Sequence, residues 1–154
     1  MMAKLKNYTT TIPAFRSIEE IQKLLVSFGA QNIIMDAENQ KVTAIKFTYR
    51  INDMILPFML PVNIDKATEV LWKEYQKLSR RGRKSKKDFY DEAERISWRI
   101  ARDWIHTQLS ILTIEATDFI HVFAGYLVTN TTTCETLGNR LQNSDFRKLL
   151  EEKK

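Results

Sequence analysis

The chain has 154 residues, and its 44% hydrophobic and 28% charged content, which is ordinary for a globular protein, predicts one domain with its own core. Its single cysteine, Cys134, excludes an internal disulfide framework and indicates a reducing compartment. We expect neither a signal peptide nor a membrane span, because the start has no apolar run and charged residues interrupt the most apolar stretch, residues 111–128.

The first 30 residues predict a strand followed by a helix. Residues 4–12 are rich in threonine and end before Pro13, as is typical of a β-strand. Ser17 and Glu20 have the spacing of a capping box, in which a hydroxyl and a carboxylate bond free amides at a helix start. The helix is expected to end at Gly29, where a left-handed backbone is easily adopted. Its expected buried stripe contains Ile18, Ile21, Leu24, Leu25 and Phe28.

The next 30 residues predict three antiparallel strands, at residues 32–37, 41–51 and 54–60. The second strand alternates, with apolar side chains on one face and polar side chains on the other. The apolar set is Ile45, Phe47, Tyr49 and Ile51. A two-residue turn leads to the third strand. Because Pro57 has no N–H to donate, we expect that strand at an edge of the sheet.

Two helices are predicted after the sheet. Asn63 is the expected N-cap of the first, whose apolar face contains Ala67, Val70, Leu71, Tyr75 and Leu78. The second has the longest helical pattern in the chain, and at about 100° per residue its apolar face covers about half the circumference. That face contains Ala93, Ser97, Ile100, Trp104, Gln108 and Ile111, widened by Trp98, Ala101, Ile105, Leu109 and Leu112. We therefore predict a central helix with Trp104 in the middle of its buried face.

The C-terminal third predicts shorter elements. Residues 119–123 either continue the long helix or begin a second one, residues 129–134 form a polar loop, and residues 144–150 form a last short helix. The order β-α-β-β-β-α, followed by helices, predicts an α+β fold. In it a small antiparallel sheet packs on the long central helix, with further helices at the C-terminus.

Positive charge is concentrated in residues 73–87. This segment holds eight Lys or Arg residues against one acidic residue, for a net charge of +7, whereas the rest of the chain has 16 basic and 18 acidic residues and a net charge of −2. Such a segment, with its basic connector at residues 79–87, can bind phosphate groups by charge alone. The alternative is a solvated loop that keeps the protein soluble. The candidate nucleic-acid-binding residues here are Lys77, Arg80, Arg81, Arg83, Lys84, Lys86 and Lys87.

Three arginines of the long helix extend this candidate site. Arg95, Arg99 and Arg102 fall on one face of the helix and complete the set of candidate nucleic-acid-binding residues. The alternative is that they form ordinary ion pairs along the helix surface, such as Asp91 with Arg95 and Asp103 with Arg99.

Several motifs are spread along the chain. They include NYTTTI at residues 7–12, IEEIQKLL at residues 18–25, AERISWRI at residues 93–100 and RDWI at residues 102–105. These motifs resemble those of a widespread group of small uncharacterised proteins of phages, prophages and mobile elements, and the resemblance covers nearly the whole chain. It implies a phage-type origin and a cytoplasmic setting in the host cell. The group has no established activity, so the resemblance implies no catalytic residue. The basic connector at residues 80–87 is richer in lysine and arginine than is usual in the group.

A second likeness is topological. Residues 17–79 are predicted to run helix, three strands, helix, which is the order of double-stranded-RNA-binding domains. Those domains carry a histidine in the first hairpin loop and a lysine cluster at the start of the second helix. Here neither the loop at residues 37–40 nor the helix start at residues 64–67 carries its signature. The likeness is therefore one of element order alone.

No catalytic motif is present in the sequence. It has no glycine-rich phosphate loop, no nucleophile elbow and no pair of histidines at metal-binding spacing. His106 and His121 are fifteen positions apart, and one cysteine cannot complete a zinc site. We therefore expect no enzymatic activity, no metal and no cofactor.

Two classes of function remain open. The first hypothesis is a phage-type accessory protein that binds nucleic acid through residues 73–87. The alternative is an antagonist that occupies a host protein, such as a defence nuclease, or that sequesters a small nucleotide signal with arginines as phosphate ligands. Neither hypothesis includes a membrane partner.

Overall fold

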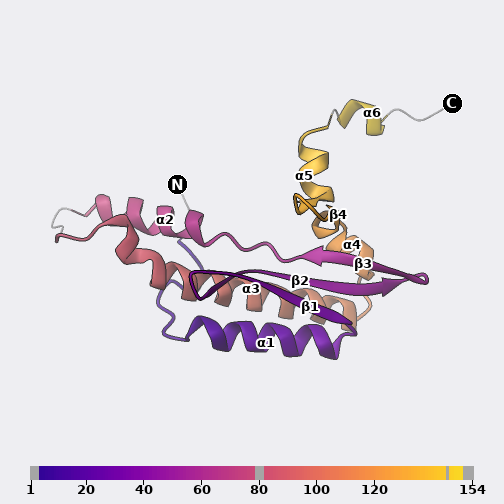
Figure 1. Ribbon diagram of the computed structural model, residues 1–154, viewed down its shortest axis with the longest axis horizontal. Coiled ribbons are helices and arrows are strands. Elements are labelled where there is room, and N and C mark those ends of the chain that lie inside the picture. Colours follow the sequence, from indigo (N-terminus) through magenta and orange to yellow (C-terminus); the bar gives the residue numbers. More distant parts are fainter. Residues whose placement is uncertain (1–3, 79–81, 145, 151–154) are drawn as a thin grey trace.

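The computed structural model describes residues 4–78, 82–144 and 146–150 (Figure 1). These residues form an α+β fold, as the sequence predicts. A three-stranded antiparallel sheet has the order β1-β2-β3, and a second sheet pairs β4 with β5. The strands are β1 (Asn32–Glu38), β2 (Lys41–Ile51), β3 (Met54–Met59), β4 (Val128–Asn130) and β5 (Glu135–Thr136).

Six α-helices and two 3₁₀ helices, η1 and η2, accompany the sheets in the described part of the chain. They are α1 (Ala14–Ser27), α2 (Ile64–Gln76), η1 (Lys86–Phe89), α3 (Tyr90–Thr113), α4 (Phe119–Phe123), η2 (Ala124–Tyr126), α5 (Leu137–Gln142) and α6 (Phe146–Leu150). None of the helices within these described residues is long and apolar enough to cross a membrane.

The strand predicted at residues 4–12 is wrong. All of these residues are described and none lies in a strand; residues 6–9 form a turn, with Asn7 in the left-handed region at φ 61° and the Thr10 N–H donating to the Asn7 carbonyl at 2.9 Å. The side chains of Lys6 and Asn7 both contact Asp103 on α3. The segment thus packs on a helix, where the threonines have no neighbouring strand to pair with.

Helix α1 begins one turn earlier than the predicted capping box. It starts at Ala14, after Pro13, so Ser17 lies inside the helix, fully buried and with no hydrogen-bond partner among the described residues. The predicted apolar stripe is confirmed. Ile18, Ile21 and Leu25 are buried, and Leu24 and Phe28 pack against them. Gly29 follows the helix with φ 104°, the conformation expected of a glycine at this position.

The three predicted strands of the main sheet are confirmed. Phe47 on β2 lies opposite Ile33 on β1 and Phe58 on β3, so one row of apolar side chains crosses the sheet. β3 is at an edge, as Pro57 predicts. On the opposite face Lys46 forms an ion pair with Asp36 at 2.7 Å. The alternation of β2 therefore separates a buried face from a polar one.

Helices α1 and α3 lie side by side on the buried face of the sheet (Figure 1). Their buried residues join those of the sheet and Phe123 of α4 in one hydrophobic cluster. The members from α1 and the sheet are Ile18, Ile21, Leu25, Ile45, Phe47 and Phe58, and those from α3 are Ala93, Trp98, Ala101, Ile105 and Leu109. Helix α3 is thus the central element that its sequence pattern predicts.

The buried face of α3 is centred differently from the prediction. Trp98 is fully buried, whereas Trp104 is half-buried and lies against Phe123 and Tyr126. Helix α2, with 13 residues, packs on only part of the 24-residue α3. The flank that holds Trp104 is therefore covered by the short C-terminal elements instead of by a long helix, and the centre of the core shifts toward Trp98.

The C-terminal third contains a hairpin that the sequence analysis did not predict. β4 and β5 pair with Val128 opposite Thr136, so the predicted polar loop at residues 129–134 is mostly the turn of this hairpin. The alternative of a second helix at residues 119–123 is confirmed, since α4 is separate from α3 and is capped by Asp118. Helix α5 was missed, and α6 corresponds to the predicted last helix. Figure 1 shows α5 and α6 extending away from the main sheet.

Candidate nucleic-acid interface

The described parts of the basic segment, residues 73–78 and 82–87, lie at the end of α2 and before α3, at one end of the molecule (Figure 1). Arg80 and Arg81 lie outside the described residues. The other candidates from the segment all have exposed side chains, namely Lys77, Arg83, Lys84, Lys86 and Lys87. The structure therefore presents at least five cationic side chains to solvent at this end.

Three aromatic rings anchor the end of the connector. Phe89 is buried, and its ring centroid lies 6.1 Å from that of Trp72 and 5.2 Å from that of Tyr75 on α2. The Lys84 ammonium lies 5.4 Å from the Phe89 centroid, within range of a cation–π contact. This cluster fixes residues 84–89 against the end of α2. The spacing of the aromatic residues was visible in the sequence, but their meeting across the connector was not.

Hydrogen bonds between Ser85 and Asp88 also fix the end of the connector. The backbone N–H and the hydroxyl of Ser85 donate to the carboxylate of Asp88 at 2.6 and 3.0 Å, and the Asp88 N–H donates to the Ser85 carbonyl at 3.1 Å. The hydrogen bond from the Ser85 backbone N–H makes the largest contribution to lowering the pKa of Asp88, and the bond from the Ser85 hydroxyl makes the next largest. This capping box starts η1, and its Ser-x-x-Asp spacing is a sequence signal that we missed.

The cations of the segment differ in their partners. Lys77 forms an ion pair with Glu74 at 2.9 Å, and Lys86 forms a longer one with Glu69 at 3.5 Å. Within the described part of the chain, Arg83 and Lys87 lie within ion-pair distance of no acidic side chain. The least neutralised positive charge is therefore on the connector itself and at the start of η1.

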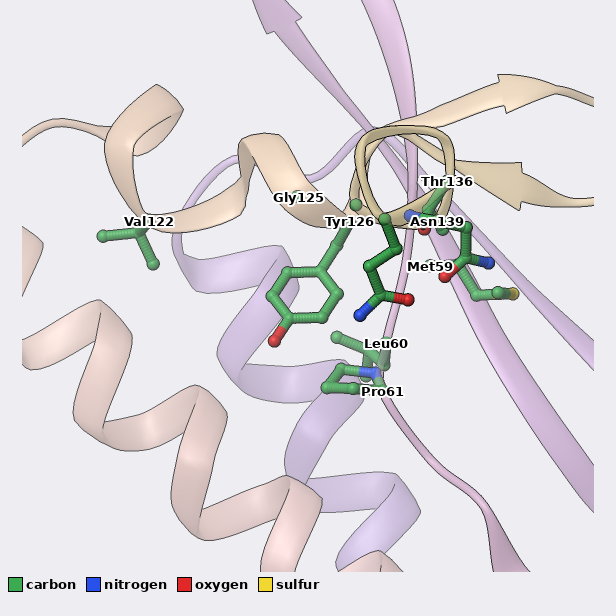
Figure 2. Close-up of a pocket in the computed structure, with 10 residues that line it drawn as sticks. Met59, Leu60, Pro61, Val122, Gly125, Tyr126, Thr136 and Asn139 are labelled. Carbon is green, nitrogen blue, oxygen red and sulfur yellow. Dashed lines mark hydrogen bonds between the residues drawn. The ribbon is translucent and has the colours of Figure 1, made fainter. Parts of the chain in front are cut away.

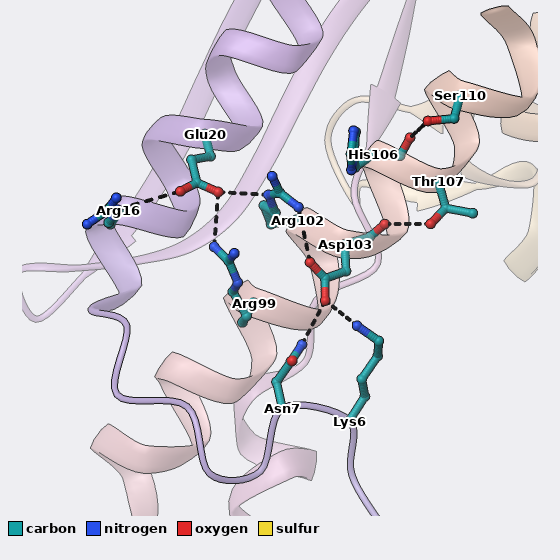
Figure 3. A network of polar contacts seen from close by, with 10 residues as sticks. All are labelled: Lys6, Asn7, Arg16, Glu20, Arg99, Arg102, Asp103, His106, Thr107 and Ser110. Atoms are coloured by element: carbon teal, nitrogen blue, oxygen red, sulfur yellow. Dashed lines mark hydrogen bonds and ion pairs between the residues drawn. The ribbon is translucent and has the colours of Figure 1, made fainter.

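Arg99 and Arg102 both form ion pairs with Glu20 of α1, as Figure 3 shows. Arg99 Nη1 lies 3.0 Å and Arg102 Nε 2.7 Å from the same oxygen, Glu20 Oε2. The two arginine side chains are only 18% and 24% exposed. The predicted pairing of Arg99 with Asp103 is therefore wrong, because its partner comes from another helix. Neither arginine extends the exposed basic surface.

Asp103 completes this network on the other side of Arg102. Its carboxylate accepts from Arg102 Nη1 at 3.3 Å and from Asn7 Nδ2 at 2.9 Å, and it contacts the Lys6 ammonium. Burial alone would raise the pKa of Asp103, but the contacts with Lys6 and Asn7 outweigh it and lower that pKa to about 2. Burial opposes ionisation of Glu20 as well, yet the charge of Arg99 and the hydrogen bonds of both arginines lower its pKa.

Arg95 stands apart from this network. Its side chain is half-buried, and its Nε is enclosed without a hydrogen-bond partner among the described residues. Its predicted partner Asp91 contacts Lys41 instead, and the pKa of Asp91 is lowered first by Lys41 and only then by Arg95. Of the three candidate arginines on α3, Arg99 and Arg102 are bound by Glu20, and Arg95 is half-buried with its Nε enclosed.

Among the described residues, the other side chains that could bind a metal or react chemically are not grouped in one site. Across residues 4–78, 82–144 and 146–150, no three His, Cys, Asp or Glu side chains are grouped so as to hold a metal ion. Cys134 is a free, half-buried cysteine, and His121 contacts Asp118, the N-cap residue of its own short helix, at 2.7 Å. Comparisons of the chain with known protein families, curated proteins and solved structures find no significant match.

Proposed function

We propose that this protein is a small phage-type accessory protein, without enzymatic activity, that binds the phosphate backbone of nucleic acids in the cytoplasm of the host cell. The observation that carries the proposal is the unneutralised positive charge between α2 and α3, where Arg83, Lys84 and Lys87 are exposed. The phage-type assignment is supported by the motifs at residues 93–105. The binding surface comprises Lys77, Arg80, Arg81, Arg83, Lys84, Lys86 and Lys87.

Charge separation within the chain supports this assignment. Residues 73–87 carry a net charge of +7 and the remainder a net charge of −2, so attraction for a polyanion is confined to one end of the molecule. Each phosphate neutralised by a lysine or arginine releases condensed counterions, which makes such binding strong at low salt and insensitive to sequence. The aromatic anchor at Phe89 keeps the cations of residues 84–87 close together, which lets them contact neighbouring phosphates.

A matched pair of charge variants tests the proposal. One replaces Arg83, Lys84 and Lys87 by Ser, and the control replaces three exposed cations elsewhere, Lys23, Lys66 and Arg140, by Ser. Both variants lose the same net charge. Affinity for duplex DNA and for single-stranded RNA is measured by fluorescence anisotropy over a range of salt concentrations. We expect the first variant to lose about tenfold or more in affinity and its salt slope to flatten by about 2 to 3 units, with little change in the control.

Equal losses in the two variants would show that net charge, and not the connector, determines binding. Undetectable binding by the unmodified protein at low salt would overturn the proposal altogether. Affinity capture from the host cell, with and without nuclease, then tests the host-protein antagonist. A partner that stays bound after nuclease treatment and is lost with the Arg83, Lys84 and Lys87 substitutions would favour that alternative.

A further inference from the structure

A solvent-open cavity of about 390 Å³ lies between the end of β3 and the C-terminal elements (Figure 2). Its walls come from three separate segments of the chain. The connection from β3 to α2 supplies Leu60 and Pro61, the α4–η2 segment supplies Val122 and Tyr126, and α5 supplies Asn139 and Gln142. The cavity is distinct from the basic segment, which shares none of its lining residues.

Close backbone packing builds one wall of this cavity. A Cβ atom added to Gly138 would lie 2.8 Å from the carbonyl oxygen of Gly125, closer than Cβ atoms approach other atoms in real structures. The Leu137 N–H donates to the Leu127 carbonyl at 2.8 Å. The start of α5 is therefore seated directly on η2. Residues three apart on a helix share a face, which is how Asn139 and Gln142 both line the cavity.

An aromatic ring forms a second wall. The centroid of the Tyr126 ring lies 5.1 Å from that of Trp104, edge to face, and Trp104 lies 5.7 Å from the buried Phe123. Tyr126 is thus supported from behind by α3 and the core. A ring restricted in this way is a suitable surface for stacking another flat ring, because it has less side-chain entropy to lose on binding.

The cavity is uncharged and mostly apolar, with a few polar side chains in its lining. Its ten lining residues include no Asp, Glu, Lys, Arg or His. The side-chain amides of Asn139 and Gln142 each offer both donors and an acceptor, and Leu60, Pro61 and Val122 provide apolar surface. An uncharged flat ring with donors and acceptors along its edge matches this lining. Nucleobases have this chemistry, and side-chain amides pair with base edges while aromatic rings stack on base faces.

We propose that this cavity accepts one unpaired nucleobase of a single-stranded nucleic acid, with Tyr126 beside the base and Asn139 and Gln142 at its edge. The inference rests on the proposed nucleic-acid binding and specifies its preferred substrate as single-stranded. The start of α3 at Tyr90 and its Trp104 are separated by about 20 Å along the helix axis. At about 3.4 Å per nucleotide, about six nucleotides span that distance, and the connector cations precede Tyr90, so a strand that contacts both the connector and the cavity must be longer than about six nucleotides.

The test compares two one-residue amide deletions. Gln142→Ala removes an amide from the cavity, and Gln31→Ala removes an exposed amide from the loop before β1. Each variant and the unmodified protein are titrated with a labelled single strand of about 12 nucleotides and with a duplex of the same sequence. We expect Gln142→Ala to weaken single-strand binding about fivefold or more and duplex binding by less than about twofold, and Gln31→Ala to change neither.

The outcomes separate this inference from the proposal on which it rests. If the unmodified protein binds the single strand and Gln142→Ala binds it equally well, the cavity has no role and the inference fails, while nucleic-acid binding stands. Equal loss on duplex and single strand would also overturn it, since a paired base cannot enter the cavity. If the unmodified protein binds neither the single strand nor the duplex, the proposed function fails.

Discussion

Arg102 Nε on α3 lies 2.7 Å from the carboxylate of Glu20 on α1, and this contact joins the two helices that cover the sheet. The same carboxylate oxygen binds Arg99, so one acidic residue holds two guanidinium groups. All three side chains are less than a third exposed, and an ion pair with that degree of burial is only partly screened by water.

Replacing Glu20 tests the strength of this contact. We expect Glu20→Gln to lower the free energy of unfolding by about 1–2 kcal/mol, because it removes the ion pair of Arg99 and leaves Arg102 with only the longer contact to Asp103. The neighbouring Glu19 pairs with Lys23 on the exposed side of α1, so Glu19→Gln should change stability by less than about 0.5 kcal/mol. Urea unfolding of both variants gives the comparison. Equal small losses would mean that the Glu20 contact stabilises no more than a surface pair.

The acid stability of the protein should depend on Asp103. Its folded-state pKa of about 2 is below the ordinary 3.8, so the ionised carboxylate stabilises the fold. That contribution is complete above about pH 4 and is lost as the pH falls through about 2. We expect Asp103→Asn to cost about 1 kcal/mol at neutral pH, allowing for screening because Lys6 is largely exposed. Urea unfolding at several pH values should show the difference shrinking below pH 4, and a pH-independent difference would contradict this account.

The elements that the sequence predicted well are those with local signals. The alternation in residues 41–51 gave the bounds of β2, and Asn63 does cap α2, accepting from the Lys66 N–H at 2.9 Å. Local signals misled where tertiary contacts outweighed them. Residues 4–12 have strand-like composition but are held in turns by the contacts of Lys6 and Asn7 with Asp103. Short C-terminal elements such as α5 depend on packing against η2, which no local pattern in the chain indicates.

The candidate site likewise has features that local sequence predicts and features that depend on tertiary contacts. Exposure of the connector cations could be expected from their density in the sequence, because so many like charges cannot be buried. The sequestering of Arg99 and Arg102 could not, since Glu20 lies 79 and 82 positions away along the chain. The spacing rule for ion pairs on a helix surface applies only to residues three or four positions apart. The uncharged cavity beside α5 likewise brings residues 59–61 together with the C-terminal residues 122–142, which follow them by about 60 positions or more.

The two tryptophans of α3 should differ sharply in their contribution to stability. Trp98 is fully buried in the main cluster, so Trp98→Ala should cost about 3–5 kcal/mol. Trp98→Phe should cost less, because it keeps most of the volume and removes an indole N–H that has no partner among the described residues. Trp104→Ala should cost about 1–3 kcal/mol, since that side chain is half-buried at the edge of the core. Urea unfolding ranks the three variants, and a larger cost for Trp104→Ala would contradict the structure.

Ser17 distinguishes the structure from the capping box that its sequence suggests. If Ser17 were the N-cap of a helix, its replacement by alanine would cost about 1 kcal/mol. In the structure its hydroxyl is buried inside α1 without a described partner, so Ser17→Ala should leave stability unchanged or raise it by up to about 1 kcal/mol. Thermal and urea unfolding measure the difference. A loss of about 1 kcal/mol or more would show that the hydroxyl has a stabilising partner.

The salt dependence of nucleic-acid binding tests the central claim most directly. The unmodified protein is compared with a variant in which six connector cations are replaced by Ser, namely Arg80, Arg81, Arg83, Lys84, Lys86 and Lys87. Affinity for duplex DNA is measured from about 50 to 300 mM salt, and the slope of log affinity against log salt is taken for each. We predict binding at low salt whose slope is steeper than that of the variant by about 3 to 5 units. Equal slopes for the two proteins, or no binding by the unmodified protein at about 50 mM salt, would contradict the account.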